Sequence, residues 1–250
     1  MIPRINHSRS QLQSHLNSYE DGPYSLFVSK DIYPALIDFH LPQIRAKSPQ
    51  GWKIKPNGAM RYLWFPGLED EDVTAAKEWC ERFSTYVLLG LNPNIESHFS
   101  DELDFCMALD FNYNPSSEKR TVFGEAEYQL KFKGSRQHLQ VLGHAMLDAI
   151  ADLPIPEQHR DSYCVTCIPA PPGQMTVARQ IATGIAKRLK REFIDAQLNC
   201  PKTALKGLPV DKKIPIWKDL YNRGCVELTG SVEGRLIVII DDLYQSGATM

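Results

Sequence analysis

Two adjacent carboxylates, Asp241 and Asp242, follow an apolar run at residues 236–240. Such a run is typical of a central parallel strand, which brings the residues after it to the carboxyl edge of the sheet, where ligands bind. The loop that follows combines small and hydroxyl residues, namely Gln245, Ser246, Gly247, Ala248 and Thr249. Because Gly247 permits close backbone approach, the N–H groups of this loop can surround a phosphate. Acids beside a phosphate loop suit a sugar phosphate, since carboxylates bind ribose hydroxyls or Mg²⁺.

The elements around this motif predict a βαβ unit with a parallel sheet. An apolar run at 163–168 indicates a strand, and it ends in the turn at 169–173. The apolar stripe after this turn predicts a helix from about 174 to 197. The run at 236–240 then predicts a second parallel strand. We therefore expect an α/β fold for this part of the chain.

The first half of the chain predicts a mixture of helices and strands. We expect helices at 8–16, at 31–40 and from about 70, and a short strand at 62–66. A strict alternation of apolar and polar residues at 126–133 predicts a strand, and Ser135 can begin the next helix. These elements predict an α+β N-terminal region, and residues 1–124 resemble no known family.

Composition excludes several classes of protein. The chain has 250 residues, a net charge of −2 and 43% hydrophobic residues, as is ordinary for a globular protein without global attraction to nucleic acid or anionic membrane. Its N-terminus is polar and its apolar runs are short, so we expect a cytoplasmic protein with no membrane contact. The basic residues at 187–191 favour a solvated helix face over a nucleic-acid site, because no aromatic residues interleave with them.

The six cysteines are scattered and do not form the disulfide framework of a small secreted protein. Cys164 and Cys167 form a CxxC pair within the expected strand at 163–168. Residues three apart in a strand point to opposite faces and cannot share one metal ion. We therefore expect two buried, small apolar side chains rather than a zinc site.

Residues 237–249 resemble the signature of type I phosphoribosyltransferases: an apolar strand, two acids and a Thr/Ser-Thr/Ser-Gly-x-Thr/Ser loop. Within that group the chain is most similar to the ComF-like branch. The similarity continues upstream through Gly234 and Arg235, and more loosely through Lys-Phe-Lys-Gly at 131–134 and Cys-Ile-Pro-Ala-Pro at 167–171. It covers about residues 125–250 and implies a parallel-sheet phosphoribosyltransferase-like domain.

The resemblance implies a role for each matching position. Asp241 and Asp242 would bind the ribose of phosphoribosyl pyrophosphate, with Mg²⁺ as cofactor, and residues 245–249 would hold its 5′-phosphate. The turn containing Ala170 and Gly173 would bind pyrophosphate. The connection at 202–223 would be the mobile loop, whose candidates for contacting pyrophosphate are Lys206, Lys212, Lys213 and Arg223. The reaction implied is displacement of pyrophosphate at the anomeric carbon by an unidentified acceptor.

The chain departs from the family pattern at several points, and Gln245, the double proline and the absence of the helix after the loop favour a second function class. Gln245 replaces a hydroxyl residue of the signature, Pro171 and Pro172 offer no N–H to an anion, and the zinc module of many ComF-like proteins has no counterpart. The sequence also stops at Met250, directly after the loop, where the fold has a helix whose N-terminus helps to bind the phosphate. We therefore expect either a truncated sequence or an incomplete domain, and poor phosphate affinity if nothing follows. The alternative to an enzyme is a non-catalytic module that senses a nucleotide or binds a partner protein in DNA uptake or processing.

Two further interpretations of the acid pair remain. The acids can be plain surface residues, or the acidic edge of another doubly wound fold such as a receiver or a dehalogenase-type phosphatase. Those folds usually carry their acidic strand early in the chain, whereas Asp241 and Asp242 come last. The sequence indicates neither the acceptor nor the oligomeric state.

Overall fold

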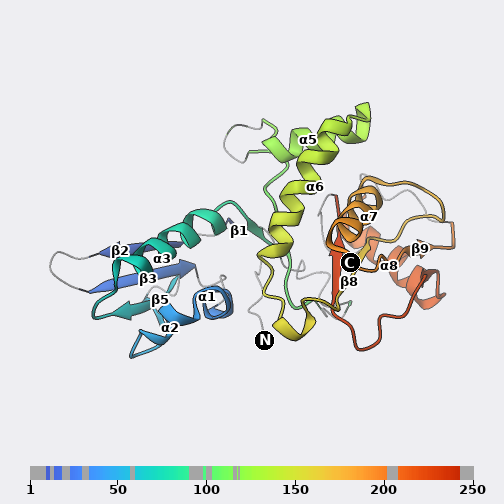
Figure 1. Ribbon diagram of the computed structural model, residues 1–250. Coiled ribbons are helices and arrows are strands. Elements are labelled where there is room, and N and C mark those ends of the chain that lie inside the picture. The colour runs from blue at the N-terminus through green and yellow to red at the C-terminus, as the bar shows by residue number, and fades with distance from the viewer. Residues whose placement is uncertain are drawn as a thin grey trace. The chain divides into compact units, whose positions relative to one another are not determined.

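The computed structural model describes residues 10–11, 14–18, 23–29, 34–56, 60–89, 98–99, 103–114, 117, 119–201 and 208–242 (Figure 1). The chain forms two compact units. One comprises Met1–Gly90 and Glu102–Asp110, and the other comprises Leu91–Asp101 and Phe111–Met250. Both helices and strands occur in each unit. Among the described residues, no helix has the length and apolar character needed to cross a membrane.

The first unit contains a four-stranded antiparallel sheet in the order β2-β3-β5-β4. These strands are β2 (Ser14–Ser18), β3 (Tyr24–Ser29), β4 (Lys53–Ile54) and β5 (Met60–Phe65). The helices of this unit are α1 (Pro34–His40), α2 (Pro42–Ala46) and α3 (Asp70–Phe83). A small second sheet joins β1 (Ser10–Gln11), β6 (Val87–Leu88) and β7 (Met107–Ala108).

Most expectations for this unit are confirmed, with one exception. The predicted strand near 62–66 and the helix beginning at 70 are present, and α1 lies within the predicted 31–40 helix. The predicted helix at 8–16 is wrong, because the described residues there belong to β1 and β2. Leu16 pairs with Leu26 of β3, so strand pairing prevails over weak local helix propensity.

In the second unit, α5 (Val122–Lys133) and α6 (Arg136–Ala151) form two consecutive helices that pack against each other. The strand predicted at 126–133 is therefore wrong. Helix caps decide the local structure: the Thr121 side chain accepts a hydrogen bond from the N–H of Gly124, and Gly134 ends the helix with a φ of 62°. Burial also follows the helical period, since Ala126 and Leu130 are buried while Phe132 is 62% exposed.

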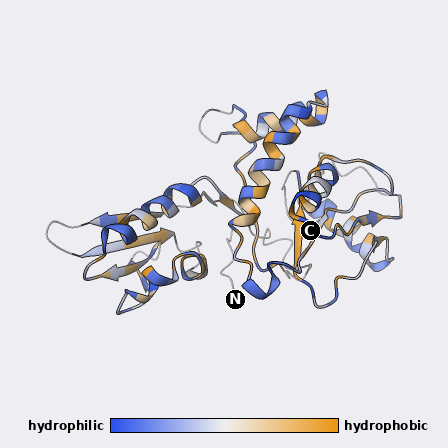
Figure 2. Cartoon of the chain, viewed as in Figure 1, coloured by the Kyte–Doolittle hydropathy of each residue, from blue (hydrophilic) through white to orange (hydrophobic). Residues whose placement is uncertain are grey.

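The two predicted parallel strands are present and pair with each other. β8 (Cys164–Cys167) and β11 (Ile237–Ile240) are parallel, with Val165 opposite Val238. Figure 2 shows β11 as a hydrophobic ribbon, as expected for a central strand. α7 (Val177–Leu189) follows β8 and packs against both strands.

A third strand, β9 (Ala196–Leu198), continues this sheet beyond β8. Parallel bridges join Val165 to Phe193 and Ala170 to Gln197, and β10 (Val226–Leu228) pairs antiparallel with β9. The predicted helix to residue 197 was therefore too long. α7 ends at Leu189, and its C-cap residue Lys190 has a left-handed φ of 54°. The buried residues Ile194, Ala196 and Leu198 alternate with polar ones in the strand period, a signal that the helical interpretation overlooked.

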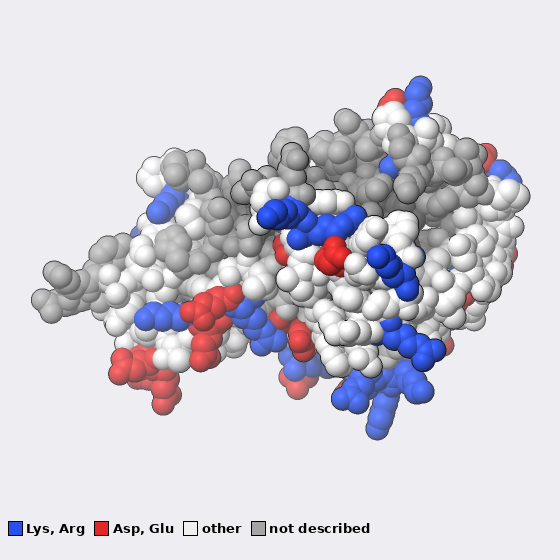
Figure 3. Space-filling view, turned by 90° about the horizontal axis from the view of Figure 1, so that it is seen from above, with Lys and Arg blue, Asp and Glu red and all other residues white. Residues whose placement is uncertain are grey.

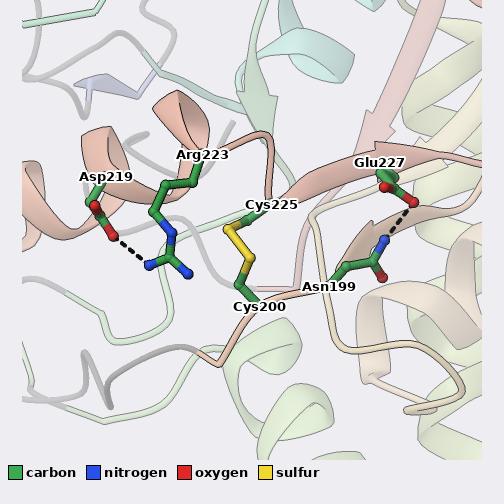
Figure 4. Close-up of a disulfide and its surroundings, with 6 residues drawn as sticks. All are labelled: Asn199, Cys200, Asp219, Arg223, Cys225 and Glu227. Atoms are coloured by element: carbon green, nitrogen blue, oxygen red, sulfur yellow. Dashed lines mark hydrogen bonds and ion pairs between the residues drawn. A yellow bond between two sulfur atoms is a disulfide. The ribbon is translucent and has the colours of Figure 1, made fainter.

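The connection expected to be a mobile loop at 202–223 contains a helix, α8 (Val210–Asn222). Its buried face forms a small core with Leu198 and with Cys225, which is 1% exposed. Cys225 forms a disulfide with Cys200 that closes the segment between β9 and β10 (Figure 4). The spacing of the cysteines in the sequence did not predict this disulfide.

Candidate functional site

Asp241 and Asp242 lie where the sequence predicted, directly after the last residue of β11. The carboxyl end of β8 lies beside them, because the N–H of Ile168 donates to the carbonyl oxygen of Ile240 at 3.2 Å. The N–H of Asp242 donates to Oδ1 of Asp241 at 2.7 Å, which fixes the first carboxylate over the strand end. The Asp242 side chain is 15% exposed. The sheet thus presents both acids at its carboxyl edge.

A lysine from α5 meets this acid pair. Lys131 Nζ lies 3.2 Å from Oδ2 of Asp242 and 3.2 Å from Oε1 of Glu127, one helical turn earlier on α5. Burial lowers the pKa of Lys131, but the attraction of the Asp242 and Glu127 carboxylates outweighs it, and the pKa lies above the ordinary lysine value. The lysine is therefore charged at neutral pH and bridges two carboxylates.

Sequence reasoning assigned no role to Lys131, although the segment 131–134 belonged to the loose upstream similarity. The missing signal was the secondary structure. In the predicted strand, Glu127 and Lys131 would be four residues apart and about 13 Å distant, whereas in a helix they are neighbours. No local sequence pattern could predict the contact between Lys131 and Asp242, because the two residues are 111 positions apart in the chain.

In the turn after β8, Ala170 is bonded to the sheet and the residues after it are exposed to solvent. Ala170 is 5% exposed, its N–H donates to Ala196 of β9 at 3.3 Å, and its carbonyl oxygen accepts from Leu198 at 2.9 Å. The N–H of Ala170 is thus committed to the sheet, and the predicted contact of Ala170 with pyrophosphate stays a prediction. Gly173 lies in the exposed part of the turn with a left-handed φ of 73°.

Two N–H groups of this turn remain for an anion. No described residue accepts a hydrogen bond from the N–H of Gly173 or of Met175, and both residues are exposed. The N–H groups of Gln174 and Thr176 are used within the turn, donating to Pro171 and Gln174 respectively. The turn is followed by the N-terminus of α7, whose partial positive charge favours an anion.

The remaining predicted residues are not brought to this edge by any described contact. Arg223 lies just after α8, and within the described part of the chain its side chain pairs with Asp219 alone, at 2.8 Å (Figure 4). Lys206 and the phosphate-loop residues Gln245, Ser246, Gly247, Ala248 and Thr249 lie outside the described residues. Arg179 of α7, which sequence reasoning overlooked, lies beneath the turn after β8 and is 5% exposed.

Comparison with known proteins adds no relative. No protein-family model, no curated protein and no solved structure matches the chain. What the site can do therefore rests on its own chemistry. Among the described residues, its edge holds more carboxylates than ammonium groups, which favours a cation or a cation-chelated anion over a free anion.

The two cysteines of the CxxC pair lie at the two ends of β8. Cys164 and Cys167 are both buried and free of disulfides, and burial raises the pKa of both thiols. Across the described part of the chain, no group of three His, Cys, Asp or Glu side chains is placed to hold a metal ion. The expectation of two buried, small apolar side chains is confirmed.

The basic residues near the end of α7 were expected to form a solvated helix face rather than a nucleic-acid site. Arg191 is committed locally: it pairs with Asp161 at 2.8 Å, and its guanidinium lies 5.1 Å from the ring centroid of Tyr163. On the face shown in Figure 3, lysines and arginines form small groups among uncharged and acidic residues. The local pairing of Arg191 suits a solvated helix face, and the absence of a nucleic-acid site at residues 187–191 stays a prediction.

Proposed function

We propose that the second unit binds phosphoribosyl pyrophosphate with Mg²⁺ and transfers its phosphoribosyl group to an acceptor. The observation that carries this proposal is the acid pair at the end of β11, with Lys131 bound to its second carboxylate at 3.2 Å. The neighbouring turn after β8 supports it, because no described residue accepts a hydrogen bond from the N–H groups of Gly173 and Met175. The spatial order β11-β8-β9 supports a type I phosphoribosyltransferase-like sheet.

The residues present fit a Mg²⁺ ion that is held largely by substrate. Asp241 and Asp242 supply oxygen ligands of the kind that Mg²⁺ prefers, but too few for a site made by protein alone. Ribose hydroxyls, pyrophosphate oxygens and waters would complete the coordination. The ion would neutralise the charge that develops on pyrophosphate as it leaves.

The chain's own residues would bind and orient the two ends of the substrate. The acid pair would accept hydrogen bonds from the ribose hydroxyls, and the N–H groups of Gly173 and Met175 would donate to the pyrophosphate. Lys131 would keep Asp242 from repelling the anionic substrate. Such positioning and electrostatic stabilisation can supply much of the catalysis in a reaction whose transition state resembles an oxocarbenium ion.

A second candidate function is binding without turnover. Pro171 and Pro172 occupy the exposed part of the turn and offer no N–H, which leaves fewer donors for a leaving pyrophosphate. A module of this kind would sense a nucleotide or phosphoribosyl pyrophosphate and report it to a partner protein, for which DNA processing is the role that the resemblance implies.

Release of pyrophosphate distinguishes the two functions. The protein is incubated with phosphoribosyl pyrophosphate, Mg²⁺ and each of a panel of nucleobases, and released pyrophosphate is measured. We expect one acceptor to stimulate release, Asp241→Asn to abolish it, and Glu233→Gln to leave it unchanged, since Glu233 is exposed in the turn before β11. Binding without release under any acceptor would favour the sensor.

A further inference from the structure

Arg179 in the first turn of α7 is the most heavily bonded buried charge among the described residues. Its Nε donates to Oδ1 of Asp195 at 2.8 Å, and the side chains of the two residues are 6% and 17% exposed. Its remaining N–H groups donate to main-chain carbonyl oxygens, those of Ala170, Pro171, Gln174 and Ala196. A buried guanidinium is costly unless such partners surround it.

These contacts draw the carbonyl oxygens of the turn after β8 toward α7. In a trans peptide unit the C=O and the following N–H point in opposite directions. Since the carbonyl oxygen of Gln174 faces the guanidinium, the N–H of Met175 points away from it. The guanidinium also neutralises the partial negative charge of these oxygens, which would otherwise repel an anion.

The sheet does not need Arg179 in order to pair. Ala170 and β9 already exchange two main-chain hydrogen bonds, from Ala170 to Ala196 at 3.3 Å and from Leu198 to Ala170 at 2.9 Å. What the arginine adds is the link between Asp195 at the start of β9 and the carbonyl oxygens of Pro171 and Gln174, which lie in the exposed part of the turn.

We infer that Arg179 is the positioning residue of a pyrophosphate-binding turn. It holds the carbonyl oxygens of Pro171 and Gln174 inward, anchors them to Asp195 just before β9, and so turns the N–H of Met175 outward, where it and the N–H of Gly173 can donate to the anion. Arg179 itself is buried and does not touch the ligand. The identity of the anion rests on the proposed function, whereas the ordering of the turn does not.

The test compares ligands with and without pyrophosphate. Inorganic pyrophosphate, phosphoribosyl pyrophosphate and ribose 5-phosphate are titrated, each with Mg²⁺, into wild type, Arg179→Lys and the control Arg188→Lys, which changes an exposed position of the same helix. Lysine keeps the charge but cannot reach Asp195 and the turn together. We expect Kd for the two pyrophosphate compounds to rise about tenfold in Arg179→Lys and Kd for ribose 5-phosphate to stay within about twofold.

Hydrogen exchange in the ligand-free protein gives a second readout. Amides of residues 173–176 should exchange faster in Arg179→Lys than in wild type, at a temperature where both proteins are folded. If Arg179→Lys does not fold, Asp195→Asn removes the anchor while retaining the arginine. In that variant Kd for the two pyrophosphate compounds should rise by less than tenfold, and Kd for ribose 5-phosphate should stay unchanged.

The outcomes separate the inference from the proposed function. Wild type that binds none of the three ligands contradicts the proposed function and the pyrophosphate assignment, while faster exchange in the variant would still support the ordering of the turn. Wild type that binds, with Arg179→Lys equal to it in all affinities and in exchange, overturns the inference. An equal loss of affinity for all three ligands in Arg179→Lys would assign Arg179 a general structural role. That result would also overturn the inference.

Discussion

At the scale of single residues, the site depends on one ammonium shared between two carboxylates. Lys131 lies 3.2 Å from Glu127 on its own helix and 3.2 Å from Asp242 at the end of β11. This arrangement ties α5 to the carboxyl edge of the sheet.

The pKa of Lys131 gives this ion pair a defined pH dependence. Because the pKa is higher in the folded chain than the ordinary value of 10.5, the pair stabilises the fold fully below about pH 10.5 and loses its effect as pH rises through the raised pKa. The side chain is 40% exposed, so the contribution should stay below about 1 kcal/mol. Denaturant unfolding of wild type and Lys131→Met should differ at about pH 8, and the difference should shrink as pH rises through the raised pKa of Lys131. A difference that stays constant across this range would contradict the assignment.

Asp241 and Asp242 could be predicted because an apolar run and two acids are neighbours in sequence. The same local reasoning could not reach Lys131, whose partner lies 111 residues away, nor Arg179, whose partners are mostly main-chain oxygens of a turn. Every residue has a main-chain carbonyl oxygen, so no sequence pattern shows which arginine donates hydrogen bonds to such oxygens.

At the scale of elements, continuous apolar runs were more reliable signals than alternation. β8 and β11 were predicted correctly because each is a buried strand with no helical period. The alternation at 126–133 was misleading, since a helix with buried Ala126 and Leu130 can also place apolar residues at every second position. The caps at Thr121 and Gly134 were present in the sequence and would have decided the question.

The N-terminal turn of α5 should be intolerant of any side chain at Gly124. A Cβ at this position would lie 2.0 Å from the carbonyl oxygen of Asn112, so Gly124→Ala must displace backbone. We expect a loss of about 1–3 kcal/mol or more in the free energy of unfolding. Gly143→Ala on α6 is the matched control: nothing lies within 4 Å of its Cβ, and helix propensity predicts a gain of up to about 1 kcal/mol. Equal effects of the two substitutions would contradict the described packing of α5.

The disulfide should make the stability of the second unit sensitive to reductant. Cys200 and Cys225 are 25 residues apart, and a cross-link over such a loop stabilises by about 3 kcal/mol in the chain-entropy model. Addition of dithiothreitol should lower the unfolding midpoint of wild type and leave the double variant Cys200→Ala/Cys225→Ala unchanged. Insensitivity of wild type to reductant would show that the bond does not form in the protein.

At the scale of the whole molecule, each of the two units contains buried hydrophobic residues. Leu26, Leu63 and Phe65 belong to the first unit, while Val165 and Trp217 belong to the second. Chains of this kind need not unfold in a single step. The proposed site lies entirely in the second unit, as does the disulfide.

Calorimetric unfolding should therefore show two transitions. The transition that dithiothreitol lowers is that of the second unit, and phosphoribosyl pyrophosphate with Mg²⁺ should raise the same transition. At about 100 times Kd the ligand should add about 2.7 kcal/mol to the stability of that unit alone. A ligand that instead raises the reductant-insensitive transition would place the binding site in the first unit.

The central claim is that the acid pair at the end of β11 binds phosphoribosyl pyrophosphate, and calorimetric titration at neutral pH tests it most directly. Wild type should bind this ligand with Kd of about 1 μM in the presence of Mg²⁺ and more weakly without it. Kd should rise about tenfold or more in Asp242→Asn and in Lys131→Met, and remain unchanged in Lys133→Met, an exposed lysine of the same helix. Absence of binding to wild type, or binding to Asp242→Asn with unchanged Kd, would contradict the claim.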